Sequence, residues 1–542
     1  MAWVTRQSAT HQDGHRGSDA NFLRVSLCLE YPTGYSVVGR FRRMIRARGA
    51  QVVSAGISLS GAVVQKTHTV SWRGVAGFGA WLLVASVHVF PGCGPAAAQP
   101  VSDVPIEPLP VAVLPPELDP FYKAPASDIA TTPPGGILKA RQITSSYFNL
   151  IPERVDAWQL LYRTNDSRGR AIATVTTVIT GHGATPPEGR KLLSYQIQED
   201  SNSAYCAPSY GLQQGSIPYF SDFLNQIESN IGVAEALSNG YVVSIPDYEG
   251  PNSAFGAAIL EGQATLDGIR AAENFRPLQL PGKDTRVGLL GYSGGSVPTG
   301  WIAEHAPAYA PELDIAGIGI GGVVMADLPA LARADNFNVF AGLVGPAVFG
   351  LGTEYPDLAT VLATKTDWFT RFVTTTKVAL CHTPYGAIDF PFWNFLGGYT
   401  GTQPGGFLNE PAVTAAFEDV RLGKNRPTVP LYVYHAQNDE IIPIAGTDRL
   451  VNWYCQDPDQ SITYTRELLA EHLVGFTSWM AKSYDFVVDR LEDKPLQKGC
   501  RIDSPATTTS DGELAGMLNE TFPTTGQLMT GQEVQPHPHA PR

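Results

Sequence analysis

A serine set between glycines is the feature that most constrains this chain. The motif Gly291–Gly295 (GYSGG) follows the apolar run Val287–Leu290 and precedes Ser296–His305, which has the composition of a helix. A G-x-S-x-G motif between a buried strand and a helix lifts its serine off the sheet on a tight turn. Backbone N–H groups at such a turn can hold a negatively charged oxygen. We therefore predict that Ser293 is a catalytic nucleophile.

Short apolar runs alternate with helical stretches on both sides of this motif. Strands that are separated by helices favour an α/β fold with a mostly parallel sheet. The predicted strands are Ala171–Ile179, Leu192–Ile197, Tyr241–Ile245, Val287–Leu290, Ile315–Ile320 and Val429–Tyr434, and the predicted helical stretches include Val233–Ser238 and Ala257–Asn274.

Composition excludes several classes of protein. The chain has 542 residues, of which 43% are hydrophobic, so it can bury a large core. Its net charge of −13 disfavours a nucleic-acid partner, because an acidic surface repels phosphate. No stretch reaches 18 uninterrupted apolar residues, which excludes a protein that spans a membrane several times.

The N-terminal segment differs from the rest in charge. Residues 1–98 contain ten Lys and Arg against three Asp and Glu, which leaves a net charge of −20 for the remainder. Within this segment Arg73 precedes the largely apolar run Gly74–Phe90, and the small-residue stretch Gly92–Ala98 follows it. A basic flank, a short apolar segment and a small-residue end are typical of a signal peptide. A membrane anchor or a buried helix is the alternative.

This pattern predicts that the mature protein is secreted. A signal peptide does not begin seventy residues into a chain, so we expect translation to start at Met44 or at the codon of Val70. The sequence then divides by composition into an over-long leader (1–98), a Pro-rich arm (99–135), an α/β core (136–322 and 428–500), an insertion rich in Phe, Leu, Ala and Gly (323–427), and a C-terminal segment with a flexible tail (501–542).

A serine hydroxyl needs a general base, and in this fold the order along the chain is Ser, acid, His. His472, in Ala470–Leu473 (AEHL), follows the last predicted strand at a junction with a helix and is our candidate. Five other histidines follow Ser293 and are excluded by position: His305 at the far end of the helix, His382 in the insertion, His435 ahead of the acid candidates, and His537 and His539 in the tail.

The acid is expected in the loop between the strand Val429–Tyr434 and His472. Asp439 is our candidate and Glu440 is the alternative, since both lie in a turn directly after that strand. For the oxyanion hole, one N–H comes from Gly294, the residue after the nucleophile. We assign the second to the N–H of Asp247, in the loop that follows Tyr241–Ile245.

Cysteine usage agrees with export. Cys28 and Cys93 fall in the leader, and an even number of four remains: Cys206, Cys381, Cys455 and Cys500. Four cysteines in an exported chain indicate two disulfides, for which three pairings are open.

With these residues placed, the chain resembles the secretory lipases of the Candida lipase A type. The resemblance rests on several motifs in the same order along the chain: Pro246–Pro251 (PDYEGP), Ala264–Ala271 (ATLDGIRA), Gly291–Gly295 (GYSGG), Tyr434–Pro443 (YHAQNDEIIP) and Glu471–Leu473 (EHL). It implies the α/β-hydrolase fold, a triad of Ser293, Asp439 and His472, and Asp247 and Gly294 as oxyanion donors.

The resemblance implies further features. The insertion becomes a helical lid, and the disulfides become Cys206–Cys381 and Cys455–Cys500. The expected protein is a secreted triacylglycerol lipase that acts on lipid or other esters, a function compatible with work at a lipid–water interface. Neither a metal nor an organic cofactor, and neither a protein nor a nucleic-acid partner, is implied.

Two other functions stay open at this point. A carboxylesterase for soluble short-chain esters would use the same triad, and a non-catalytic binding protein could keep the same fold. The insertion is expected to form the wall that binds the acyl chain. Substitutions that narrow its run Phe340–Leu351, such as Gly345→Phe or Gly350→Phe, are then expected to favour shorter esters.

Overall fold

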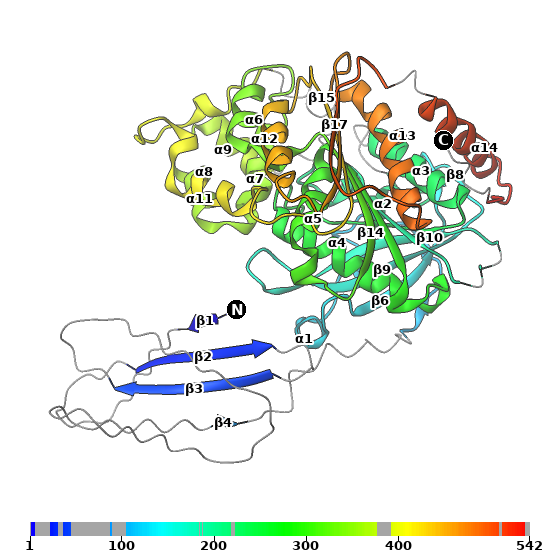
Figure 1. Ribbon diagram of the computed structural model, residues 1–542, viewed down its shortest axis with the longest axis horizontal. Coiled ribbons are helices and arrows are strands. Elements are labelled where there is room, and N and C mark those ends of the chain that lie inside the picture. Colours follow the sequence, from blue (N-terminus) through cyan, green and yellow to red (C-terminus); the bar gives the residue numbers. More distant parts are fainter. Residues whose placement is uncertain are drawn as a thin grey trace. The chain divides into compact units, whose positions relative to one another are not determined.

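A large mixed sheet organises the chain after Gln99 (Figure 1). The computed structural model describes residues 104–536 except 184, 187, 218–222, 377–391 and 509–511, together with four strands nearer the N-terminus. The sheet runs in the spatial order β17 (Gly499–Asp503), β16 (Ser461–Glu467), β15 (Leu431–Ala436), β14 (Asp314–Gly321), β13 (Arg286–Tyr292), β11 (Leu192–Gln196), β12 (Val242–Pro246), β10 (Ala171–Thr180), β9 (Asp156–Asn165), β6 (Ile137–Ile143) and β5 (Ile106–Glu107).

Neighbouring strands among β11 to β17 run parallel to one another, whereas β10 pairs antiparallel with both β12 and β9. All six strands that the sequence predicts are present. The prediction missed β6, β9 and β16, because polar residues interrupt their apolar positions, as in Ser461–Glu467 (SITYTRE). Between β6 and β9 in the chain, β7 (Ser146–Tyr147) and β8 (Ile151–Pro152) form a separate two-stranded sheet.

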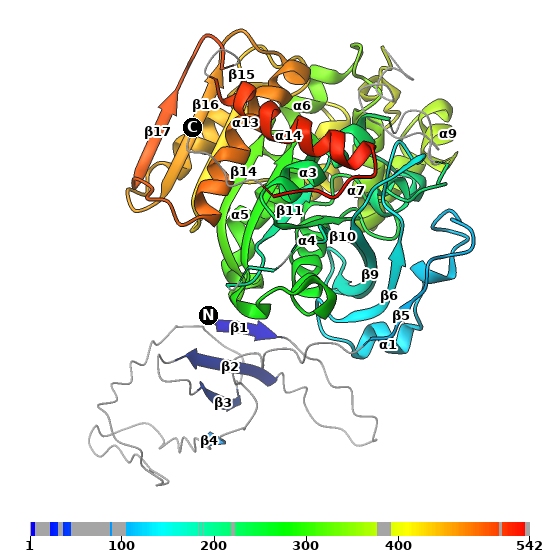
Figure 2. The same ribbon diagram turned by 90° about the vertical axis from the view of Figure 1, so that its right-hand side faces the viewer.

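Helices cover both faces of this sheet because its strands are apolar on both sides. Val242 of β12 packs into the core under α4 (Ala258–Glu273) and α5 (Ser296–Tyr309), and Val243 packs into the core on the other face. That second face carries α3 (Phe223–Ser238) and α13 (His472–Leu491). The helix α14 (Glu513–Met529) lies against α3 and α13 (Figure 2).

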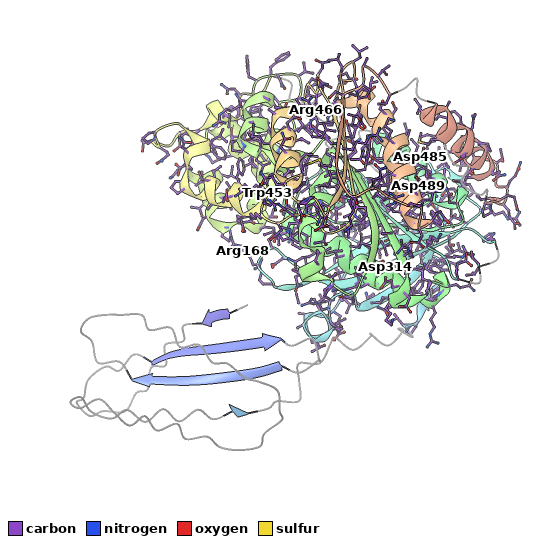
Figure 3. All side chains as sticks on the ribbon, viewed as in Figure 1. Arg168, Asp314, Trp453, Arg466, Asp485 and Asp489 are labelled. Atoms are coloured by element: carbon purple, nitrogen blue, oxygen red, sulfur yellow. A yellow bond between two sulfur atoms is a disulfide. The ribbon has the colours of Figure 1, made fainter. Side chains whose placement is uncertain are left out.

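The insertion between β14 and β15 is helical. Its helices gather at one side of the sheet in Figure 1 and form a cap: α6 (Leu328–Asp335), α7 (Val344–Glu354), α8 (Pro356–Thr364), α9 (Trp368–Thr376) and α11 (Pro411–Val420). After β15, the helix α12 (Ile444–Tyr454) returns the chain to β16. Arg466 of β16, which Figure 3 labels, makes two hydrogen bonds to the Asp448 carboxylate of α12, at 2.8 and 2.9 Å.

The two ends of this unit are tied to the core. In the Pro-rich arm, Asp119 forms a buried ion pair with Arg141 of β6 at 2.6 Å, and Phe121 packs against Leu161 and Val175. The arm also contains the short helix α1 (Ala126–Thr131), which contacts β10. The short helix α2 (Pro208–Gly211) lies in the core and contacts β10 as well. The helix α14 in the C-terminal segment was not predicted.

Residues Met1–Gln99 form a separate compact unit. It contains a four-stranded antiparallel sheet of β1 (Ala2–Thr5), β2 (Phe22–Glu30), β3 (Ser36–Met44) and β4 (Val87–His88). The predicted signal-peptide run Gly74–Phe90 lies outside the described residues except for β4. Among the helices that the structure describes, we find none with the length and apolar character needed to cross a membrane.

A disulfide joins Cys455, directly after α12, to Cys500 of β17 across 45 residues of chain. Of the two pairs implied by the resemblance, this one is present. Cys206 is also disulfide-bonded, and its expected partner Cys381 lies outside the described residues.

We expect removal of the Cys455–Cys500 bridge to lower stability, because the bridge restricts the unfolded chain. A closed loop of this length corresponds to about 4 kcal/mol in the chain-entropy account. The Cys455→Ala/Cys500→Ala protein should therefore melt at a clearly lower temperature than the unchanged protein in differential scanning calorimetry. An unchanged melting temperature would show that the bridge does not contribute to the stability of the protein.

Candidate active site

Ser293 stands at the end of β13 on a turn that only glycines allow. Its own backbone is left-handed, with φ of 52°. A Cβ on Gly291 would lie 2.2 Å from the Gly295 carbonyl oxygen, and one on Gly295 would lie 2.0 Å from the carbonyl oxygen of Gln196. Both contacts are with backbone atoms that cannot move away. The spacing of the motif therefore follows from the close approach of β13, α5 and the end of β11.

The imidazole of His472 reaches this serine from the first residue of α13. The helix begins there because the Glu471 carboxylate accepts the N–H groups of Leu473 and Val474, at 2.9 and 2.7 Å. The Tyr292 hydroxyl donates to the His472 carbonyl at 2.7 Å, and its ring packs against the imidazole. In this position His472 Nε2 lies 2.9 Å from Ser293 Oγ.

Asp439 contacts the other nitrogen of the same imidazole. Its Oδ2 lies 2.8 Å from His472 Nδ1, and its Oδ1 accepts the N–H groups of Ile441 and Ile442 at 3.0 and 2.6 Å. The alternative acid, Glu440, instead accepts the backbone N–H of His472 at 2.7 Å. The structure thus brings Asp439, and not Glu440, to the imidazole.

A second buried histidine supports the acid loop, and sequence reasoning missed it. His435, at the end of β15, has no exposed surface. Its Nε2 lies 2.9 Å from the Ile442 carbonyl oxygen and 3.4 Å from Asp439 Oδ2, and Thr447 Oγ1 lies 3.0 Å from its Nδ1. Burial lowers the pKa of His435, which favours the neutral ring. The sequence signal that could have found this role of His435 is its position four residues before Asp439.

Charges around His472 favour a basic imidazole. Burial alone would lower its pKa, but the carboxylate of Asp439, with smaller effects from Glu440 and Asp200, raises the pKa of His472 above its usual value. For Asp439, burial opposes the charged form, but the adjacent His472 outweighs it and lowers the pKa of Asp439. The Asp439 carboxylate thus makes the imidazole of His472 a stronger base, which suits it to accept a proton.

The assignment of Asp247 to the oxyanion hole is wrong. The Asp247 N–H donates to the Val175 carbonyl at 2.8 Å, and its carboxylate accepts the N–H and O–H of Ser209 at 2.9 and 2.6 Å. Asp247 follows β12, and β11 separates β12 from the serine strand β13. Its amide is therefore both occupied and one strand too far away.

Asp200 occupies the place that Asp247 was expected to fill. It lies in the loop after β11, which is the direct neighbour of β13. A Cβ on Gly294 would lie 1.7 Å from Asp200 Oδ1, so the loop and the serine turn are in contact. No hydrogen bond within the described residues uses the Asp200 N–H. Because β12 comes between β11 and β13 in sequence but not in space, chain order alone favoured the wrong loop.

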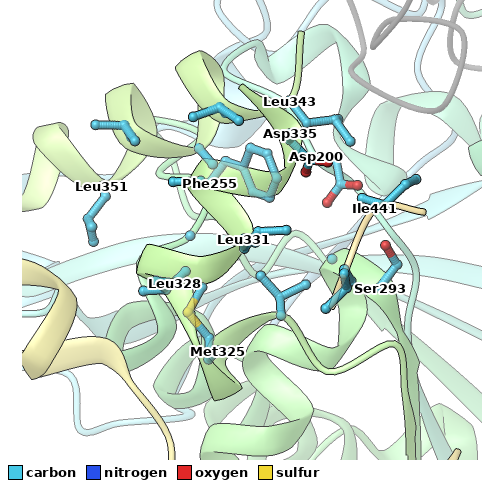
Figure 4. Close-up of a pocket in the computed structure, with 18 of the residues that line it drawn as sticks. Asp200, Phe255, Ser293, Met325, Leu328, Leu331, Asp335, Leu343, Leu351 and Ile441 are labelled. Atoms are coloured by element: carbon cyan, nitrogen blue, oxygen red, sulfur yellow. The ribbon is translucent and has the colours of Figure 1, made fainter. Parts of the chain in front are cut away.

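An apolar pocket opens over Ser293 and Gly294. Its cavity volume is about 70 Å³. Figure 4 shows Ser293, Asp200, Asp335 and Ile441 at one end and Leu351 at the other. Phe255 and Met325 contribute to its apolar lining. Cap residues supply most of the rest, namely Leu328, Leu331, Leu343, Val344, Ala347 and Val348.

Two glycines of the cap, Gly345 and Gly350, are unsuited to the narrowing substitutions that the sequence suggested. A Cβ on Gly345 would lie 2.3 Å from the Trp393 ring, and one on Gly350 would lie 2.4 Å from backbone atoms of Phe255. A phenylalanine at either position would disrupt packing in the cap. Ala347 and Leu331 line the pocket instead and are only partly buried.

Two carboxyl groups in this pocket are held in apolar surroundings. Burial raises the pKa of Asp200 to about 7 and that of Asp335 to about 8. Elsewhere, His305 bonds to the Trp301 carbonyl at 2.9 Å and takes no part in the site, while His382, His537 and His539 lie outside the described residues. Within the described ranges, no three His, Cys, Asp or Glu side chains are grouped so as to hold a metal ion.

Comparisons with known proteins place this geometry in a family. The family model described as secretory lipase matches residues 217–499. Lipase A of Arthroderma benhamiae is 36% identical over 397 residues, which is 72% of this chain and 82% of that protein. The chain belongs to the secretory lipase family.

Two further comparisons extend this result. The X-ray structure of Candida antarctica lipase A matches with a TM-score of 0.67 and 27% identity, over 79% of this chain and 100% of that one. A relative from Mycobacterium tuberculosis, 35% identical over 70% of this chain and 83% of that protein, is named a probable inactive lipase. The fold is the α/β-hydrolase fold, and the chain is a lipase, a hydrolase of carboxylic esters.

Proposed function

We propose that this lipase cleaves esters by acyl transfer to Ser293, with His472 as general base and acid and Asp439 as its partner. One observation carries the proposal: a single imidazole lies 2.9 Å from Ser293 Oγ and 2.8 Å from the Asp439 carboxylate. Family membership alone would be weaker support, because one relative is named as probably inactive.

The first half of the reaction forms the acyl-enzyme. His472 Nε2 takes the proton of the Ser293 hydroxyl while Oγ bonds to the ester carbonyl carbon. The tetrahedral intermediate then collapses, the bond to the alcohol oxygen breaks, and His472 gives its proton to that oxygen. Asp439 keeps the Nδ1–H directed away from the serine and stabilises the imidazolium while it exists.

The second half releases the acid. A water molecule gives one proton to His472 Nε2, and its oxygen bonds to the acyl carbon. Collapse of this intermediate breaks the bond to Ser293 Oγ, which recovers its proton from His472. Only the ester and water are consumed, so no other reactant is needed.

The N–H groups of Gly294 and Asp200 hold the negative oxygen in both halves. Two observations support this: both residues line the pocket beside Ser293, and their loops are in contact. Donors fixed in place before reaction stabilise the developing charge without reorganisation, and losing one costs roughly 10²- to 10³-fold in rate.

We expect Ser293→Ala to abolish ester hydrolysis, by roughly 10⁶-fold, while the protein stays folded. The matched control is Ser296→Ala, three residues after Ser293. This change removes a buried hydroxyl that donates to the Gly322 carbonyl. Hydrolysis of p-nitrophenyl butyrate and labelling by a fluorophosphonate provide the measurements. If Ser293→Ala keeps most of its activity or still takes the label, the nucleophile is another residue.

The acyl chain occupies the apolar pocket between the serine and the cap. This fits long-chain esters such as triacylglycerols, because each methylene that leaves water contributes about 0.8 kcal/mol, or roughly fourfold in rate. The pocket lining is almost wholly apolar beyond Asp200 and Asp335.

A side chain that narrows this pocket should shorten the preferred acyl chain. We expect Ala347→Phe to lower hydrolysis of p-nitrophenyl palmitate far more than that of the acetate. Leu331→Ala should instead raise hydrolysis of the palmitate relative to that of the acetate. Rates over a series of chain lengths give the comparison. If both variants leave the long-to-short ratio unchanged, the acyl chain binds elsewhere.

Export through the predicted signal peptide completes the proposal. The match to a family described as secretory supports it, as do Arg73, the apolar run Gly74–Phe90 and the small residues up to Ala98. We expect intact-mass measurement of the protein recovered from the culture medium to place its N-terminus close to Ala98. A mature N-terminus well upstream of residue 90 would contradict this.

A further inference from the structure

The loop that follows β11 carries the Asp200 amide in a strained conformation. Asp200 has φ of 42°, in the left-handed region that side chains other than glycine rarely adopt. Its side chain is buried, and its Oδ1 has no hydrogen-bond partner within the described residues. Such a conformation persists only where the surroundings fix it. The side chain of Asp200 therefore does not account for the position of its amide.

Tyr248 fixes the loop just before Asp200. Its hydroxyl is buried, donates to the Ile197 carbonyl at 2.6 Å and accepts the Glu199 N–H at 3.1 Å. Burial, with several carboxyl groups nearby, raises the pKa of Tyr248 well above its usual value, so the hydroxyl keeps its proton. One hydroxyl thus joins two backbone groups of the loop, on either side of Gln198.

Glu249 fixes the loop just after Asp200. Its Oε1 accepts the Ser201 N–H at 3.3 Å, and its own carbonyl accepts the Ala254 N–H at 2.8 Å. The side chain has no exposed surface. The amides on both sides of Asp200 are therefore bound by two consecutive residues, and no hydrogen bond within the described residues uses the Asp200 amide between them.

The surroundings of the Glu249 carboxyl favour its neutral form. Burial and the neighbouring carboxyls of Glu199, Glu261 and Asp200 raise the pKa of Glu249 well above its usual value. A protonated carboxyl can still accept the Ser201 N–H through its second oxygen. It also places no negative charge behind an oxyanion, which a carboxylate would do.

We propose that Tyr248 and Glu249 are positioning residues of the ester hydrolase, whose hydrogen bonds to the loop 197–201 aim the Asp200 amide at the oxyanion. The motif PDYEGP then contributes to the oxyanion hole indirectly. Its Tyr248 and Glu249 hold the loop 197–201, and the amide of Asp247 takes no part. The inference rests on the proposed function, because it takes Asp200 as an oxyanion donor.

The first test compares Tyr248→Phe with Tyr162→Phe. Tyr162 is an equally buried tyrosine whose hydroxyl donates to a backbone carbonyl, that of Ala264, at 2.7 Å in another part of the fold. We expect Tyr248→Phe to lower kcat for p-nitrophenyl butyrate by about 10- to 100-fold with KM nearly unchanged. Binding of a boronic acid, which forms a tetrahedral adduct on the serine, should weaken by a similar factor. Tyr162→Phe should change neither.

The second test uses Glu249 and does not depend on the first variant folding. Glu249→Gln keeps a neutral acceptor for the Ser201 N–H, and Glu249→Leu removes it. We expect Gln to restore most of the kcat that Leu loses, at equal melting temperatures.

The outcomes separate the two claims. If the unchanged protein neither turns over esters nor takes a fluorophosphonate on Ser293, the proposed function fails. If it does both, but Tyr248→Phe loses no more kcat than Tyr162→Phe, or Glu249→Gln is as impaired as Glu249→Leu, this inference alone is overturned.

Discussion

The close approach of three backbones around Ser293 is the constraint on which the site depends. Gly291 and Gly295 leave room for β13, the start of α5 and the end of β11 to touch, since a Cβ on either glycine would lie about 2 Å from a carbonyl oxygen. This contact lifts Ser293 above the sheet in a left-handed conformation. It also brings the loop that carries Asp200 against Gly294. One packing constraint therefore positions both the nucleophile and the groups that would hold its oxyanion.

The other half of the site depends on helix α13 and the loop after β15. Glu471 starts the helix at His472, and Glu440 accepts the backbone N–H of that same residue. Two neighbouring backbone amides and the buried His435 hold Asp439. The main chain of His472 is thus held by contacts other than those of its imidazole. Catalytic groups that are positioned in this way need little rearrangement when substrate binds.

Much of this could be predicted from the sequence. The motif around Ser293 and the order of chemistry along the chain led to His472 and Asp439, which the structure brings together with Ser293. Apolar runs such as Tyr241–Ile245 located the central strands, because these are buried on both faces. The strands β6 and β16, each second from an edge of the sheet, escaped detection because polar residues interrupt their apolar positions.

The error at Asp247 has a different cause. In this sheet β12 follows β11 in the chain but lies on the side of β11 away from β13. Periodicity and composition describe single strands and carry no information about which strands are neighbours. Asp200 and Asp247 each follow a buried strand, so only the spatial order of strands distinguishes them. The roles of Tyr248 and Glu249 were hidden for the same reason, since they act on a loop almost fifty residues earlier.

The central claim is that Ser293 attacks the ester while the amides of Gly294 and Asp200 hold the oxygen. A crystal structure of the protein after reaction with a long-chain alkyl phosphonate tests it most directly. The account predicts phosphorus bonded to Ser293 Oγ, one phosphonyl oxygen within hydrogen-bond distance of both amides, and the alkyl chain in the pocket under the cap. A phosphonate on another residue, or a phosphonyl oxygen directed away from the Asp200 amide, would contradict the account.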